Sequence, residues 1–163
     1  HLPWALVARP DQPLMTVGEW GPLFFFVPGG ITKATFWIRA DVPKEAARLV
    51  VRAPDGSVAL DREGDFDTRT KIECAVPAAH ADKAWSLSLE RCARKGWHTD
   101  DVTLELDGNL PGLLSPRPEW VEQFSRNWRG AGKSRAASGK LAARPATRSA
   151  YRPLPADALA DAF

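Results

Sequence analysis

The sequence predicts an all-β protein, a two-layer antiparallel β-sandwich of about eight strands. Short apolar or alternating segments recur along residues 14–106, and turn residues such as Pro28-Gly29-Gly30 and Pro54-Asp55-Gly56 separate them. This spacing of strands and turns is typical of sandwiches and jelly rolls, so we expect the jelly-roll type. Beyond Gly130 the chain is rich in Ala, Ser, Gly, Lys and Arg. Such a stretch buries too little apolar surface to fold alone, which predicts a mostly irregular basic C-terminal extension.

Eight segments are expected as strands, in chain order: 14–17, 23–27, 32–40, 48–53, 58–60, 71–76, 85–90 and 102–106. The second is a continuous apolar run between Pro22 and Pro28, which predicts a strand buried on both faces. In the third, Phe36 and Ile38 share one face and Trp37 lies on the other.

The strand at 85–90 has the clearest alternation of the chain. Trp85, Leu87 and Leu89 point to one face, which we expect to be the core. Ser86, Ser88 and Glu90 then point to the opposite face. Trp85 and residues 24–26 are therefore expected to pack in the core.

Four segments make up the predicted domain organisation. Residues 1–21 are an extended N-terminal segment, and 22–110 are the β-sandwich domain. Residues 111–128 form a Pro-rich exit segment in which one short helix fits, because Pro118 stands near its first turn. Residues 129–163 are a basic low-complexity arm.

Charge is distributed unevenly along the chain. Residues 1–122 hold 18 acidic and 14 basic side chains, a net charge of −4, whereas eight Lys and Arg and no acid lie between 125 and 156. Such an arm packs on its own body or on a neighbouring subunit, acts as a free linker, or binds a polyanion by counterion release. Nucleic acid is the least favoured of these partners, because Tyr151 is the one aromatic residue between 130 and 162.

Two cysteines, Cys74 and Cys92, are too few for a four-cysteine zinc site. They form either one disulfide or two buried thiols. Cys92, which follows the strand 85–90, is out of phase with the inward residues of that strand unless a bulge intervenes. No apolar stretch approaches the ~20 residues of a membrane span. We therefore expect no membrane span.

Exposed aromatic rings are the first candidates for a binding site. Trp37 is on the outward face of its strand, and Trp97 lies in a loop beside His98. Sugars stack on flat rings while their hydroxyl groups reach neighbouring polar side chains. The competing interpretation is that the arm or a neighbouring domain covers these rings.

An acidic segment is a candidate calcium site. Asp61, Asp65 and Asp67 stand at alternate positions around Glu63 and Gly64 in an expected loop, 61–68. Alternate carboxylates can surround Ca²⁺, which takes six to eight oxygen ligands. The spacing departs from that of an EF-hand, so a solvated polar loop without a cofactor is the competing interpretation.

Catalytic signatures are few. No Gly-x-Ser-x-Gly motif is present, and neither cysteine has an adjacent histidine. His1, with His80 or His98, resembles the copper-binding N-terminus of lytic polysaccharide monooxygenases, which implies a copper-dependent polysaccharide oxidase as a remote alternative. We otherwise expect no enzyme activity.

The order of elements resembles the jelly-roll accessory domains of secreted bacterial proteins. The matching segments are Phe24-Phe25-Phe26-Val27-Pro28-Gly29-Gly30 with Thr32, Leu49-Val50-Val51 before Pro54-Asp55-Gly56, Val76-Pro77, Ala84-Trp85-Ser86-Leu87, and Val102-Thr103-Leu104-Glu105-Leu106. The pattern is similar to bacterial pre-peptidase C-terminal domains and to sandwiches of the carbohydrate-binding-module kind. Leu113-Leu114-Ser115-Pro116 resembles the exit segment after such domains.

The resemblance implies a non-catalytic, secreted or cell-surface module, the periplasm included. Such a module binds carbohydrate or docks another domain through exposed aromatic rings. The alternative, from a different class, is a structural subunit of an extracellular assembly whose terminal arms attach to neighbouring copies. Fold alone does not decide between these functions.

Overall fold

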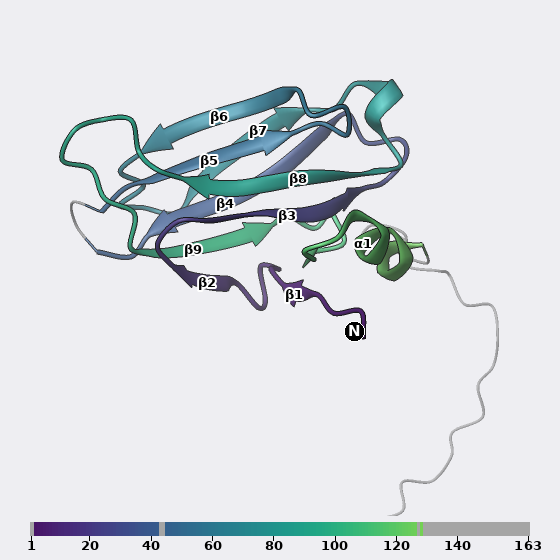
Figure 1. Ribbon diagram of the computed structural model, residues 1–163, viewed down its shortest axis with the longest axis horizontal. Helices are drawn as coiled ribbons and strands as arrows, with labels where there is room; N and C mark the ends of the chain where they lie inside the picture. The colour runs from purple at the N-terminus through teal and green to yellow at the C-terminus, as the bar shows by residue number, and fades with distance from the viewer. Residues whose placement is uncertain (1, 43–44, 127, 129–163) are drawn as a thin grey trace, which may run out of the picture.

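Two four-stranded antiparallel sheets stack face to face in the computed structural model, which describes residues 2–42, 45–126 and 128 (Figure 1). The β9 sheet, named for one of its two central strands, has the order β2-β9-β4-β7, and the β8 sheet has the order β3-β8-β5-β6. The strands of the β9 sheet are β2 (Leu14–Val17), β9 (Asp101–Leu106), β4 (Lys33–Ala40) and β7 (Thr70–Ala75). Those of the β8 sheet are β3 (Trp20–Val27), β8 (Lys83–Glu90), β5 (Ala47–Arg52) and β6 (Val58–Gly64).

Shorter elements complete the described fold. Strand β1 (Leu6–Val7) pairs with β10 (Leu113–Leu114), the 3₁₀ turn η1 (Ala78–His80) precedes β8, and the helix α1 spans Pro118–Ser125. The predicted all-β sandwich is confirmed, and each of the eight expected segments forms a strand. The expected short helix is present, with Pro118 in its first turn.

The core lies between the two sheets and follows the predicted alternation. Phe36 and Ile38 of β4 and Trp85 and Leu87 of β8 are fully buried. Phe25 meets Phe36 across the sheets with ring centroids 5.4 Å apart and perpendicular planes, the edge-to-face arrangement that aromatic quadrupoles favour. The Trp85 Nε1–H donates to the carbonyl oxygen of His80 at 2.8 Å, so the largest core side chain leaves no unpaired donor.

Strand β3 is covered on its outward face as well, over part of its length. Phe24 and Phe26 point away from the core and are half-buried. The Phe24 amide donates to the Ser115 carbonyl at 2.7 Å, and the Ser115 amide donates back at 2.9 Å. Helix α1 packs over the same region through the fully buried Val121. The apolar run of β3 is explained by burial against the core on one side and against β10 and α1 on the other.

The acidic segment differs from its prediction. Strand β6 continues to Gly64, because Arg62 and Glu63 keep pairing with Leu49 and Arg48 of β5. Asp61 therefore lies within a strand, and the loop begins only after Gly64. The prediction of a loop over 61–68 was wrong for its first four residues.

Segments at both ends of the described chain belong to the folded body. Residues 1–21, expected as extended, contribute β1 and β2 to the pairing. Residues 111–125 contribute β10 and α1, which cover the β8 sheet next to β3. The predicted basic arm, 129–163, lies outside the described residues.

Candidate functional site

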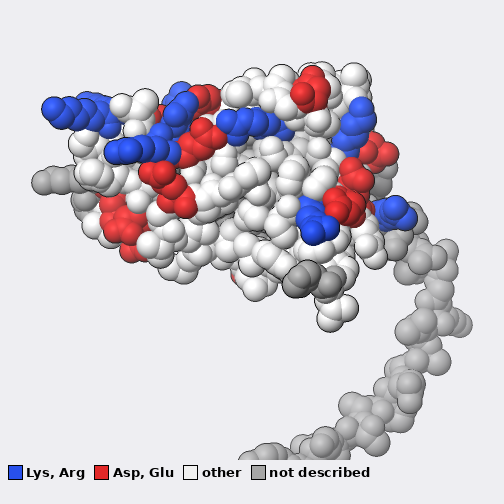
Figure 2. All heavy atoms as spheres, in the orientation of Figure 1, with Lys and Arg blue, Asp and Glu red and all other residues white. Residues whose placement is uncertain are grey.

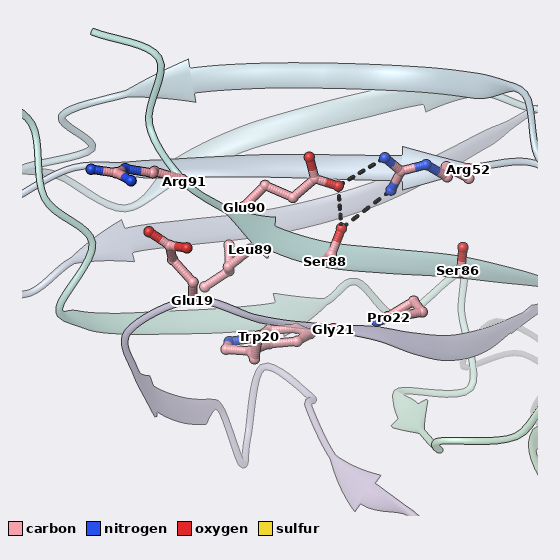
Figure 3. Close-up of a pocket in the computed structure, with 10 residues that line it drawn as sticks. All are labelled: Glu19, Trp20, Gly21, Pro22, Arg52, Ser86, Ser88, Leu89, Glu90 and Arg91. Carbon is pink, nitrogen blue, oxygen red and sulfur yellow. Dashed lines mark hydrogen bonds and ion pairs between the residues drawn. The ribbon is translucent and has the colours of Figure 1, made fainter. Parts of the chain in front are cut away.

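Helix α1 covers only part of the outward face of the β8 sheet, and the part beyond the helix is open. The alternation of β8 turns Ser86 and Ser88 outward, and two short side chains leave this part of the surface low. Figure 3 shows the resulting trough, which has a volume of about 540 Å³. Its lining comes from β3, β5, β8 and the residues beside them: Glu19, Trp20, Gly21, Pro22, Arg52, Ser86, Ser88, Leu89, Glu90 and Arg91.

Gly21 brings β3 close to the floor of the trough. A Cβ at this position would collide with the Cβ and Cα of Ser88, and the φ angle of Gly21 is +130°, which non-glycine residues rarely adopt. The pairing of β3 with β8 is irregular here, between Trp20 and Leu23. The small residues Gly21 and Ser88 let β3 and β8 approach closely, so the floor of the trough is flat at this contact.

A charged network forms the wall of the trough on the β5 side. The Arg52 guanidinium lies 2.8 Å from Glu90 Oε1 and 3.4 Å from Ser88 Oγ, and Ser88 Oγ donates to Glu90 at 3.0 Å. The hydrogen bond from Arg52 lowers the pKa of Glu90, so the pair is charged at neutral pH. Register explains the contact, since Arg52 lies opposite Ser86 and next to Ser88 on the same face. This wall offers N–H donors and carboxylate acceptors to a polar ligand.

A second hollow adjoins the trough. It has a volume of about 370 Å³ and lies along the β8–β9 loop, and Glu19 and Arg91 line both hollows. The remaining lining residues are all from this loop: Cys92, Ala93, Arg94, Lys95, Gly96, Trp97, His98 and Thr99. Two of the predicted site residues, Trp97 and His98, therefore lie together at this hollow.

Backbone contacts hold the β8–β9 loop in place. The Glu63 carboxylate of β6 accepts hydrogen bonds from the amides of Ala93 and Arg94. The His98 carbonyl accepts from the Ala46 amide at 2.9 Å. Trp97 is half-buried, and the guanidinium carbon of Arg94 lies 4.6 Å from its ring centroid. The hollow is thus anchored to β6 and to the residue just before β5.

Trp37, the third predicted binding residue, lies elsewhere. It is on the outward face of β4 in the β9 sheet, paired with Lys71 and Glu105. The guanidinium carbon of Arg69 lies 3.8 Å from its ring centroid, so one face of the ring is already covered. The structure does not bring Trp37 together with Trp97 and His98.

The three aspartates of the predicted calcium site have different surroundings, because one is paired with an arginine and the other two are exposed. Arg48 donates to both carboxylate oxygens of Asp61, at 2.8 and 2.6 Å, and this hydrogen bonding lowers the pKa of Asp61. Asp65 and Asp67 are exposed in the turn after β6. Across residues 2–42, 45–126 and 128, no three His, Cys, Asp or Glu side chains are grouped closely enough to hold a metal ion.

Cys74 and Cys92 are buried free thiols, so the alternative of a disulfide was wrong. Burial raises the pKa of both thiols, which keeps them protonated and poorly nucleophilic. His1, the predicted copper ligand of the remote alternative, lies outside the described residues.

Comparison with protein-family models, curated proteins and solved structures finds no match. Among the described residues, no helix is long and apolar enough to cross a membrane.

Sequence reasoning missed the trough, although the outward residues of β8 that form part of it could be read from the sequence. The outward positions of β8 are read directly from the alternation, and two serines followed by a glutamate at such positions already indicate a polar surface. Arg52 and Gly21 join this surface through the pairing of β3 and β5 with β8. Those partners are distant in sequence, so no local pattern identifies them.

Proposed function

We propose that the domain is a non-catalytic module that binds carbohydrate along the trough of the β8 sheet and the adjoining hollow at Trp97. The observation that carries this proposal is the continuity of the two hollows through Glu19 and Arg91. Together they join small hydroxyl side chains, a paired cation and carboxylate, and two half-buried indoles, Trp20 and Trp97. Carbohydrate sites combine apolar ring faces with a few fixed polar groups in this way.

The strand order supports the jelly-roll interpretation. Of the eight sandwich strands, only β5 and β6 pair with a neighbour in the chain, and the others alternate between the two sheets. Alternation of successive strands between two sheets is what we expect of a double-sheet jelly roll. A secreted or cell-surface location is proposed with it, since the resemblance to accessory domains of secreted bacterial proteins implies both.

Retention on insoluble polysaccharides tests the proposal. Trp97→Ala removes the indole, and Ser86→Phe fills the trough from its floor. Both should reduce retention by about tenfold or more, because each removes part of the contact surface. Met15→Phe is the matched control, since it adds a ring to the exposed outer face of the β9 sheet. Wild-type protein that is not retained on any polysaccharide of a broad panel would overturn the proposal.

A second candidate function rests on a different surface. Leu2, Trp4 and Phe124 are exposed large apolar side chains, with Trp4 48% and Phe124 38% exposed. They belong to the N-terminal segment and to α1, both of which contact β10. Exposed apolar residues at one end of a domain favour docking to another domain or subunit. Trp4→Ser with Phe124→Ser should abolish any self-association seen by light scattering; a monomeric wild type would argue against an assembly subunit.

A further inference from the structure

The hollow at Trp97 is basic on a body that is acidic. Arg91, Arg94 and Lys95 line it, with His98 beside them, and Glu19 is its one lining carboxylate. Residues 1–122 together carry a net charge of −4. Figure 2 shows Lys and Arg side chains gathered at the end of the molecule where Figure 1 draws the β8–β9 loop, with Asp and Glu side chains next to them. The lining of the hollow, with three cations and one carboxylate, is therefore opposite in net charge to the body.

These cations are exposed, and none has a carboxylate partner in the part of the chain that the structure describes. Arg91, Arg94 and Lys95 make no ion pair with any carboxylate of the described residues, whereas Arg48, Arg52 and Arg69 are each paired. Arg94 is held over the Trp97 ring. The Glu63 carboxylate is directed at backbone amides of the loop, so it fixes the loop without forming an ion pair with the cations Arg91, Arg94 and Lys95.

From this charge pattern we propose that the ligand is an acidic polysaccharide, one bearing carboxylate or sulfate groups, and this rests on the carbohydrate-binding function proposed above. An acidic sugar would place its anionic group among Arg91, Arg94 and Lys95, where guanidinium groups can donate two parallel hydrogen bonds. Its ring would lie against the face of Trp97 that Arg94 does not cover. The next sugars along the chain would enter the trough, where Ser86, Ser88 and the Arg52–Glu90 pair meet hydroxyl groups.

Nucleic acid is a less suitable ligand for the same surface. Single-stranded nucleic acid is held by several stacked aromatic rings along a continuous basic groove. Here Trp97 is the one indole of the hollow and Trp20 the one indole of the trough. The continuation toward β8 also contains the carboxylates of Glu19 and Glu90. Those carboxylates accept hydrogen bonds from sugar hydroxyls but repel a phosphate backbone.

Polygalacturonate and its fully methyl-esterified form are the decisive probes, because they share one backbone and differ in charge. Alginate and heparin extend the acidic panel, and poly(dT) represents nucleic acid. Affinity is measured by calorimetry for wild type, for Arg91→Gln with Lys95→Gln, and for a control, Arg62→Gln with Lys83→Gln. The control removes the same charge from exposed positions outside both hollows. Thermal unfolding checks that all three proteins are folded.

The expected result is an acidic glycan bound at least about tenfold more tightly than the methyl ester, since charge-assisted hydrogen bonds contribute most of the difference. The double variant at 91 and 95 should lose that preference, the control should keep it, and added salt should weaken binding. Equal binding of the acid and its ester would overturn the acidic-ligand inference and leave the proposed function standing. Retention of no glycan at all would overturn both, and tighter binding of poly(dT) would replace the glycan with nucleic acid.

Discussion

The guanidinium of Arg69 lies over the ring of Trp37, with its central carbon 3.8 Å from the ring centroid. Glu105 holds it there by accepting hydrogen bonds at 3.0 and 2.6 Å, and the Glu105 side chain is only 7% exposed. This hydrogen bonding raises the pKa of Arg69. The indole that the sequence predicts as a binding platform thus carries an arginine of its own chain.

Trp37→Ala is therefore expected to affect stability and not binding. The substitution removes a cation–π contact and the apolar cover of β4, so we expect a loss of about 1–2 kcal/mol in the free energy of unfolding. Denaturant titration measures the loss, and polysaccharide retention should match wild type. A variant that keeps its stability but loses retention would return Trp37 to the binding site.

Gly21→Ala tests the contact that shapes the trough. The new methyl group would collide with Ser88 and the residue would be held at a positive φ, so we expect destabilisation of about 2–4 kcal/mol. Gly18→Ala is the control, because Gly18 also has a positive φ but has open space around its Cβ position. It should cost about 1 kcal/mol, the conformational part alone. Equal losses in the two variants would show that the approach of β3 to Ser88 is not tight.

The outer face of the β9 sheet predicts a specific acid sensitivity. Lys33 and Lys71 each lie 2.9 Å from the Glu73 carboxylate, and their hydrogen bonds lower the pKa of Glu73 to about 2. A carboxyl group with a lowered folded pKa stabilises the protein above its unfolded pKa. That contribution is lost as the pH falls from about 4.5 toward 2.

Melting temperatures measured from pH 7 to pH 2 check this expectation. Wild type should change little above pH 5 and lose stability below it, and Glu73→Gln should lose less over the same interval. Asp100→Asn is the control, because Asp100 is exposed and makes no ion pair with the described residues. Identical acid profiles for wild type and Glu73→Gln would contradict the assignment.

The two thiols should be slow to react in the folded protein. Cys74 and Cys92 are both buried, and burial raises the pKa of each thiol. Alkylation followed by mass measurement should show no added group under native conditions and two added groups in denaturant. Rapid native labelling, or no labelling in denaturant without reductant, would contradict free buried thiols.

Local pattern predicted most of this fold. The alternation of Trp85, Leu87 and Leu89 identified the inward face of β8, and Phe36 and Ile38 did the same for β4. In both strands every second side chain points into the core as predicted, because one face of each strand packs against the opposite sheet. The chain position of all eight strands followed from such patterns and from turn residues.

The candidate site could be predicted from the sequence less well than the fold. Asp61 looks like a loop ligand until β6 pairs with β5 and places Arg48 beside it. Arg52 reaches Glu90 only through the pairing of β5 with β8. Each of these contacts depends on how two strands far apart in the sequence are aligned in the sheet. The alternation of apolar residues within one strand does not specify that alignment.

The interleaved strand order also determines when this chain can fold. Strand β9 lies between β2 and β4, and β8 lies between β3 and β5, so one of the two central strands of each sheet comes late in the chain. During synthesis β2 and β3 leave the ribosome before the strands to which they bond. Their apolar faces remain uncovered until residue 106 has emerged, which makes chaperone protection most valuable in that interval. Pairing across such separations is slow, so the domain is expected to fold late and all at once rather than strand by strand.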